Sequence, residues 1–199
     1  MDLNYNVQNI FPVSIHQFQI KDFDGMKGKL IDYVYDLKKQ DPVGKNISSR
    51  HGWQSLLVDL SKDNDLFRNF LIDCVSDLPF ISKKTSFTID TWININKTGS
   101  YNIKHCHPTS HLSGVLWLKC PEECGEIVFT SPYEFMGFAE HQLYSDEFKK
   151  SYGSYLSYYF TPDEGTMILF PSHLVHHVNE NKSDEDRISI SFNMIFNDI

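Results

Sequence analysis

The spacing of apolar residues changes along the chain from a helical period to a strand period. In the segment 24–40, "DGMKGKLIDYVYDLKKQ", apolar residues recur every three or four positions: Met26, Leu30, Val34 and Leu37. This spacing predicts a helix with one apolar stripe, ended by the following "PVG". A second helix is predicted from about residue 64 to 78, with Asp63 or Asn64 as its N-cap.

From residue 86 onward, apolar and polar residues alternate, which predicts short β-strands separated by turns rich in Gly, Pro and Asp. The predicted strands are 86–96, 112–120, 125–131, 155–162, 165–171 and 187–196, with an earlier one at 11–20. The turn "CPEECGE" at 120–126 is predicted to close a hairpin. The segment 131–153 is an insertion of the length typical of lids or binding loops.

Helices followed by many short strands are typical of α+β proteins in which the strands form a sandwich or barrel. The 199 residues are enough for one domain with a substantial core. We therefore expect a single domain, 1–199, in which the strand and helices of 1–85 support a mainly β core formed by 86–199.

Charge and hydropathy argue against two classes of partner. The net charge of −8, with no Lys/Arg cluster, disfavours nucleic-acid binding. No apolar run approaches the roughly 20 residues of a membrane span, and "MDLNYNVQNIF" lacks the pattern of a secretory signal. We therefore expect a cytoplasmic protein with no membrane partner. Cys120 and Cys124 flank "PEE" and could be zinc ligands or a hairpin disulfide, but no second closely spaced pair completes a zinc knuckle. The four cysteines are therefore interpreted as reduced and structural: Cys74, Cys106, Cys120 and Cys124.

Three histidines lie close together in "HCHPTSH": His105, His107 and His111. Residues two apart in a strand face the same side, so His105 and His107 project together and Cys106 points away. Pro108 favours this by biasing His107 toward extended backbone. Two imidazoles on one face form half of a metal site, whereas the alternative is a polar loop without metal. His111 is expected on the surface or substrate side.

The other candidate residues come late in the chain. "LFPSHLVHHV" supplies three more histidines: His173, His176 and His177. Arg187 then begins an alternating strand and shares its face with three polar residues: Ser189, Ser191 and Asn193. A buried guanidinium requires an anion, so Arg187 is interpreted either as binding an anionic ligand or as pairing with Asp184 or Glu185 at a surface.

Taken together, these motifs resemble one known family. The matching segments are "G-x-Y-N-x-x-H-x-H-P", "L-S-G-V-x-W-L", "G-x-I-x-F-x-S-P", "E-G-x-x-I-L-F-P-S-x-L-x-H-x-V" and "R-I-S-I-S-F-N". They resemble the iron(II)- and 2-oxoglutarate-dependent oxygenases, and within them small stand-alone enzymes with a prolyl-hydroxylase-like core. The resemblance extends from about Phe11 to Phe196. It implies a double-stranded β-helix (a jelly-roll, cupin-like core) with N-terminal packing helices, and Fe(II), 2-oxoglutarate and O2 as cofactor and co-substrates.

The resemblance also implies roles for individual residues. His105, His107 and His176 would hold the iron. Arg187 would form a salt bridge to the distal carboxylate of 2-oxoglutarate, and Ser189 would hydrogen-bond it. Trp117 and Asn102 would line the same pocket.

His107 departs from the wider superfamily, in which two histidines and one carboxylate hold the iron. A neutral imidazole at this position would weaken iron retention and raise the reduction potential. In the alternative, His107 does not bind and a water completes the shell.

The expected reaction is hydroxylation of a protein side chain or small molecule with release of succinate and CO2. Candidate substrate contacts are Tyr101, Phe129, Tyr133 and the segment 131–153, although Phe129 fits core packing better. The alternatives are a three-histidine cupin-like dioxygenase that does not use 2-oxoglutarate, and a non-enzymatic binding module. The sequence is compatible with an oligomer but does not determine the number of subunits.

Overall fold

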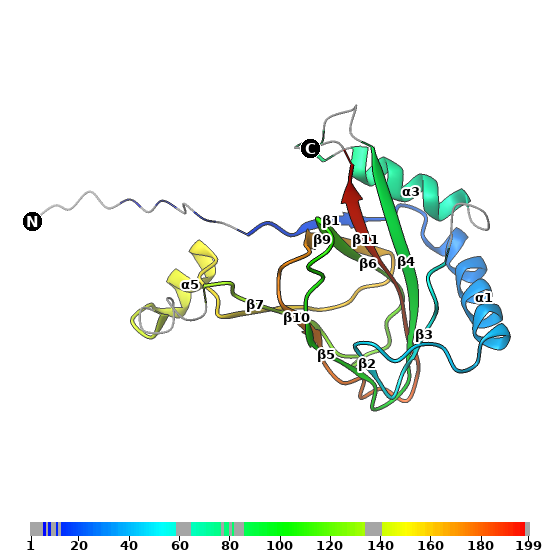
Figure 1. Cartoon of the computed structure of the whole chain (residues 1–199). Helices are drawn as coiled ribbons and strands as arrows, with labels where there is room; N and C mark the ends of the chain where they lie inside the picture. The colour runs from blue at the N-terminus through cyan, green and yellow to red at the C-terminus, as the bar shows by residue number, and fades with distance from the viewer. Residues whose placement is uncertain are drawn as a thin grey trace, which may run out of the picture.

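The computed structural model describes residues 6, 8, 11, 13–58, 65–76, 78–79, 81, 86–133 and 141–197. Within this part of the chain, two antiparallel β-sheets face each other, and two helices cover the outer side of one of them (Figure 1). The predicted fold class is confirmed: the protein is mainly β, and its two sheets form a double-stranded β-helix. That the whole chain forms one domain stays a prediction.

The larger sheet has six strands in the order β1-β9-β6-β11-β4-β3. Their bounds are β1 His16–Gln19, β9 Thr166–Pro171, β6 Leu112–Lys119, β11 Arg187–Phe196, β4 Phe87–Asn96 and β3 Trp53–Gln54. The smaller sheet has five strands in the order β2-β5-β10-β7-β8. Their bounds are β2 Ser49–Arg50, β5 Tyr101–His105, β10 His176–Val178, β7 Ile127–Thr130 and β8 Ser157–Phe160.

The alternation of β11 explains how the sheet presents two different faces. Its apolar residues Ile188, Ile190 and Phe192 are fully buried in the same core cluster as Leu30 and Val34 of helix α1, Asp24–Gln40. Helix α3, Asp65–Ser76, packs into this cluster as well. The opposite face of β11 turns toward the smaller sheet, so its polar residues point into the barrel.

Three expectations from the sequence need correction or completion. The predicted hairpin at 120–126 is wrong, because β6 and β7 belong to different sheets and the segment crosses between them. β6 is already hydrogen-bonded on both edges, to β9 and to β11, and has no edge left for β7. The strand predicted at 11–20 is shorter in the structure, where β1 spans His16–Gln19. The predicted N-caps Asp63 and Asn64 lie outside the described residues.

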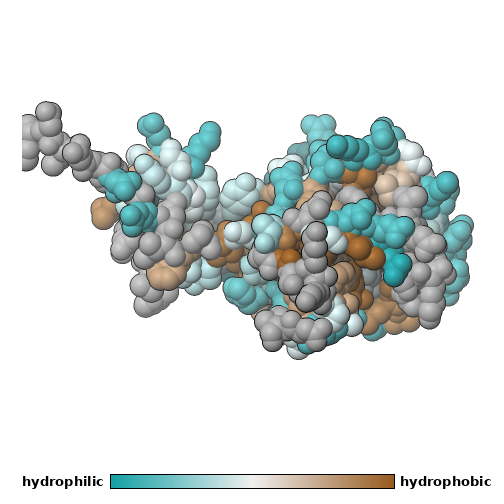
Figure 2. All heavy atoms as spheres, turned by 90° about the horizontal axis from the view of Figure 1, so that it is seen from above, coloured by the Kyte–Doolittle hydropathy of each residue, from teal (hydrophilic) through white to brown (hydrophobic). Residues whose placement is uncertain are grey.

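The described part of the insertion 131–153 contains helix α5, Asp146–Tyr152. Ser145 caps it by accepting a hydrogen bond from the backbone N–H of Phe148 at 3.2 Å, and Gly153 ends it with φ 66°. The helix stands off from the barrel beyond β7 and β8 (Figures 1 and 2). In the described part of the chain, none of the helices has the length and hydropathy needed to cross a membrane.

Replacing Gly114 with alanine is expected to destabilise the fold by about 1–3 kcal/mol, because overpacking a filled core forces its neighbours apart. A Cβ at Gly114 would lie 2.2 Å from Cζ of Phe192 and 2.8 Å from Cδ2 of Leu169. Gly28→Ala is the matched control: nothing lies within 4 Å of its Cβ position in α1. The control should gain up to about 1 kcal/mol of helix propensity. Urea unfolding measures both, and equal stabilities for the two variants would contradict the packing argument.

Candidate active site

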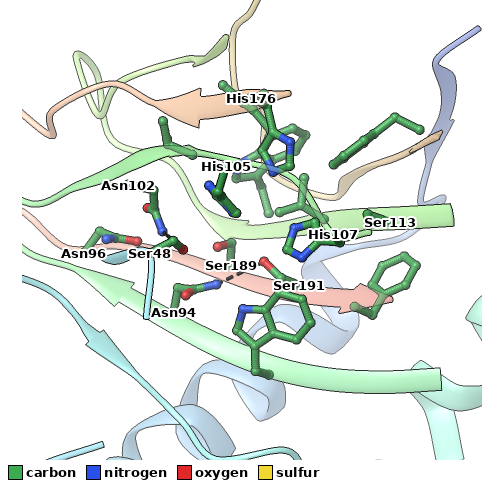
Figure 3. A pocket seen from close by; sticks show the side chains of 18 of the residues that line it. Ser48, Asn94, Asn96, Asn102, His105, His107, Ser113, His176, Ser189 and Ser191 are labelled. Atoms are coloured by element: carbon green, nitrogen blue, oxygen red, sulfur yellow. Dashed lines mark hydrogen bonds between the residues drawn. The ribbon is translucent and has the colours of Figure 1, made fainter. Parts of the chain in front are cut away.

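Three histidines from two neighbouring strands converge inside the barrel. His105 ends β5, His176 begins β10, and the two residues are paired in register across these strands. His107 follows β5 and is fixed by its backbone N–H, which donates to the carbonyl of Ser172 at 2.8 Å. One ring nitrogen from each histidine lies within 4.8 Å of the other two, which is close enough for one metal ion to bind all three (Figure 3).

On two of these rings, a hydrogen bond to the backbone determines which nitrogen can bind a metal. Nδ1 of His105 lies 2.7 Å from the carbonyl of Ile103, and Nδ1 of His176 lies 2.8 Å from the carbonyl of Leu174. A carbonyl can only accept, so each Nδ1 carries the proton and each Nε2 presents a lone pair. Metal-binding histidines are commonly oriented by such bonds.

His107 is oriented by side chains instead. The amide of Asn193 lies 3.5 Å from Nδ1 of His107, and its other end lies 2.7 Å from Oγ of Ser113. Ser113 Oγ in turn lies 2.8 Å from Oγ of Ser172. Rotating the amide by half a turn lets its oxygen accept from Nδ1–H, which leaves Nε2 of His107 able to bind a metal.

We therefore expect Asn193→Leu to weaken metal binding about 10–100-fold, the usual cost of losing a partner behind a metal ligand. Asn193→Asp keeps an acceptor beside His107 and should retain or strengthen binding. Titration of the metal-free protein with Co(II), followed by absorbance, measures both variants. Equal affinities for wild type and Asn193→Leu would show that Asn193 does not orient His107.

Burial keeps the three imidazoles neutral, which is the form that binds metal. Burial, together with repulsion from His105, lowers the pKa of His107 to about 4. Burial also lowers the pKa of His176 to about 3, and it lowers the pKa of His105. At neutral pH the three imidazoles are therefore uncharged, and the cluster can bind a cation but not an anion.

The low pKa of His176 predicts acid sensitivity of the metal-free protein. The unfolded chain protonates this residue near pH 6.5, whereas the folded chain does so only near pH 3. Protonation of His176 therefore does not lower the free energy of unfolding above pH 6.5, but lowers it by about 2 kcal/mol between pH 6.5 and 5. Urea unfolding should show that His176→Gln loses less stability than wild type over this range. Parallel pH profiles for the two proteins would contradict the shift.

The same cavity is lined by Arg187, a residue that is only 2% exposed. Its Nη1 donates to the carbonyls of Cys124, Gly125 (3.1 Å) and Asn179 (3.4 Å). Its Nη2 is buried without a hydrogen-bond partner among the described residues. Burial lowers the pKa of Arg187. An unsatisfied buried guanidinium nitrogen in a cavity favours an anionic ligand.

The surface ion pair considered for Arg187 is wrong. β11 is a central strand between β6 and β4, so its side chains are covered. Glu185 pairs with Lys119 at 2.7 Å instead. No salt bridge to Arg187 occurs among the described residues, and its Nη1 donates to three backbone carbonyls instead.

The remaining expected residues line the same cavity. Ser189 shares the inner face of β11 with Arg187, and Trp117 on β6 is its register partner. Trp117 stacks on Phe160, with ring centroids 5.5 Å apart and planes at 6°. Asn102 donates from Nδ2 to Oγ of Ser48 at 3.1 Å.

Several cavity residues were missed by the sequence reading: Ser48, Trp92, Asn94 and Asn96. Asn94 donates from Nδ2 to Oγ of Ser191 at 3.0 Å, and its Oδ1 is buried without a partner in the described part of the chain. The alternation in β4 could have identified three of these residues, because Trp92, Asn94 and Asn96 share one face. Nothing in the local sequence of Ser48 indicates its place.

Comparisons with known proteins identify the family of this chain. A family model described as "Putative 2OG-Fe(II) oxygenase" matches residues 90–193, just over half of the chain. The chain belongs to this 2OG-Fe(II) oxygenase family. As an oxygenase of this family it is an oxidoreductase, and its cofactor and co-substrates are Fe(II), 2-oxoglutarate and O2. None of the curated proteins matches it.

Solved structures support the fold of this oxygenase. A prolyl-4-hydroxylase from Pseudomonas putida is 12% identical, with 92% of each chain covered and a TM-score of 0.62. A prolyl hydroxylase from Trichoplax adhaerens, in complex with a hypoxia inducible factor peptide fragment, is 12% identical, covers 90% of this chain and 83% of its own, and has a TM-score of 0.62.

HygX from Streptomyces hygroscopicus, with nickel and 2-oxoglutarate bound, is 11% identical. The match covers 92% of this chain and 82% of HygX, with a TM-score of 0.58. At these identities the likeness concerns the fold, and the residues of the oxygenase site are argued from its own geometry.

Proposed function

We propose that this oxygenase hydroxylates a C–H bond of a peptide side chain or small molecule, consuming 2-oxoglutarate and O2 and releasing succinate and CO2. One observation carries the proposal: a single cavity is lined both by the converging His105, His107 and His176 and by Arg187, whose Nη2 has no partner among the described residues. A cation site and an anion site in one cavity suit a metal and a dicarboxylate together.

The three histidines would hold the iron through neutral nitrogens. Bound iron would supply the redox chemistry that couples decarboxylation of 2-oxoglutarate to hydroxylation of the substrate. Arg187 would bind the distal carboxylate through Nη2, and Ser189 would donate a further hydrogen bond to it. Asn102 and Trp117 would form the wall that orients this co-substrate and excludes water.

A second, larger cavity of about 740 Å³ is a candidate site through which the substrate would reach the histidines. Phe129 and Leu174 line it and lie beside His176: the ring centroids of Phe129 and His176 are 5.9 Å apart, and the Leu174 carbonyl lies 2.8 Å from Nδ1 of His176. No charged side chain lines it among the described residues. Exposed tyrosines at its rim, including Tyr133 and Tyr158, suit an uncharged peptide or aromatic group better than a charged metabolite.

The test is to incubate the full chain with Fe(II), 2-oxoglutarate and O2, and to measure succinate formation. We expect any succinate formation to depend on the metal, because bound iron would supply the redox chemistry. Anaerobic titration with 2-oxoglutarate measures binding separately. Absence of 2-oxoglutarate binding to the iron-loaded protein would refute the proposal.

The presence of His107 where the superfamily uses a carboxylate favours one alternative, a three-histidine dioxygenase that does not use 2-oxoglutarate. Arg187 weighs against it, since the alternative gives the buried guanidinium no dicarboxylate to bind. Consumption of O2 with candidate substrates in the absence of 2-oxoglutarate would favour the alternative.

A further inference from the structure

The segment between β6 and β7 carries two cysteines at either side of a turn, Cys120 and Cys124. The backbone N–H of Cys124 donates to the carbonyl of Pro121 at 3.2 Å, and Glu123 adopts a left-handed φ of 59°, so the chain turns back on itself. Cys120 and Cys124 flank this turn, and each thiol shifts the pKa of the other. Both are thiols in the structure, Cys120 partly exposed and Cys124 buried.

The same segment holds Arg187 in place. Nη1 of Arg187 donates to the carbonyls of Cys124 and Gly125, which supply two of its three hydrogen bonds. Gly125 has a φ of 87°, and a Cβ there would lie 2.3 Å from the carbonyl oxygen of Asn179. The backbone at 124–125 is therefore packed tightly between Arg187 and Asn179. A change in the turn must change the position of the guanidinium.

The chemistry of the pair suits oxidation. The hydrogen bond from Cys120, opposed by burial and aided by the charge of Arg187, lowers the pKa of Cys124 to about 7. The same contact, with burial, raises the pKa of Cys120. One sulfur is therefore partly thiolate at neutral pH, and the thiolate is the form that reacts with peroxides.

We propose that Cys120 and Cys124 form a reversible disulfide that displaces Arg187 and weakens 2-oxoglutarate binding. Hydrogen peroxide is the oxidant. The Cys124 thiolate attacks one peroxide oxygen, the O–O bond breaks, and hydroxide leaves to form water with a proton, giving a sulfenic acid. The Cys120 sulfur then attacks the Cys124 sulfur, the S–O bond breaks, and a second water leaves. Two thiols lose two electrons and one peroxide becomes two waters. A dithiol reverses the reaction by exchange.

The effect on binding rests on the proposed co-substrate role of Arg187, whereas disulfide formation does not. The experiment uses the full chain loaded with Ni(II), which avoids radical formation from peroxide. First, the affinity of the reduced protein for 2-oxoglutarate is measured by calorimetry. The protein is then treated with hydrogen peroxide, alkylated, and digested for mass spectrometry. The affinity is measured again before and after reduction with dithiothreitol.

We expect the peptide containing Cys120 and Cys124 to lose two hydrogen atoms and resist alkylation. The affinity for 2-oxoglutarate should fall at least tenfold and recover on reduction. Cys120→Ser should form no disulfide and keep its affinity after peroxide. Cys106→Ser is the matched control and should respond as wild type does.

Two results overturn the inference: no disulfide in peroxide-treated wild type, or a disulfide that leaves the affinity unchanged. A reduced wild type that does not bind 2-oxoglutarate refutes the proposed function instead, and this is known before peroxide is added. The mass spectrum then still decides whether the disulfide forms.

Discussion

Replacing Arg187 with methionine is expected to weaken 2-oxoglutarate binding about 100-fold or more. Truncating one partner of a buried, hydrogen-bonded charge pair commonly costs about 2–5 kcal/mol. Methionine fills most of the volume at this buried position and removes the charge together with Nη2. Anaerobic calorimetry with the Fe(II)-loaded variant measures the loss.

Two variants control this experiment. Ser189→Ala should weaken binding only about tenfold, the cost of one hydrogen bond to a charged group. Arg50→Met removes an arginine of β2 whose contacts stay within its own loop, with Asn46 and the carbonyls of Ile47 and Ser49, and should leave binding unchanged. Metal affinity should persist in Arg187→Met, because Arg187 does not belong to the cluster of potential metal ligands. Equal 2-oxoglutarate affinities for Arg187→Met and Arg50→Met would exclude the anchoring role.

His176→Ala is expected to reduce metal affinity by more than the 10–100-fold that is usual for losing a partner behind a ligand. His176 is the most buried of the three histidines and pairs with strands on both sides, β5 and β7. Its loss leaves two imidazoles, which cannot enclose one face of the ion. Titration of the metal-free protein with Fe(II) under anaerobic conditions, or with Co(II), measures the affinity.

His111→Ala is the matched control for this variant. His111 lies in the same segment as His105 and His107 but is exposed, and its Nδ1 accepts from the backbone N–H of Phe196 at 3.1 Å. Its placement on the surface agrees with the role expected from the sequence. The control should bind metal as wild type does. A His176→Ala variant that keeps wild-type affinity would exclude His176 as a ligand.

The spacing of apolar residues predicted those helices and strands that are long enough to show a regular period. The helix predicted at 24–40 has the bounds of α1, since one apolar stripe is enough to bury that helix on the sheet. The alternation at 187–196 predicted β11 and the division of its two faces. The short strands β2, β3 and β10 were not predicted, because two or three residues carry no measurable period.

The site was only partly accessible from the sequence. The spacing of His105 and His107 predicted that both face one side, and their rings lie 5.0 Å apart. The choice of His176 over His173 and His177 came from the family resemblance, because no local pattern distinguishes them. The structure brings His176 beside His105 by strand pairing between β10 and β5.

By itself, the sequence determined the period of the longer elements, the polar inner face of β11 and the pair of histidines that project together. Only the tertiary structure decided that the 120–126 segment crosses between sheets, that three carbonyls hold Arg187, and that Asn193 stands behind His107. The physical reason is that periodicity reports which side of an element is buried. Which elements meet depends on pairing and packing between residues far apart in the chain, and these contacts leave no local pattern.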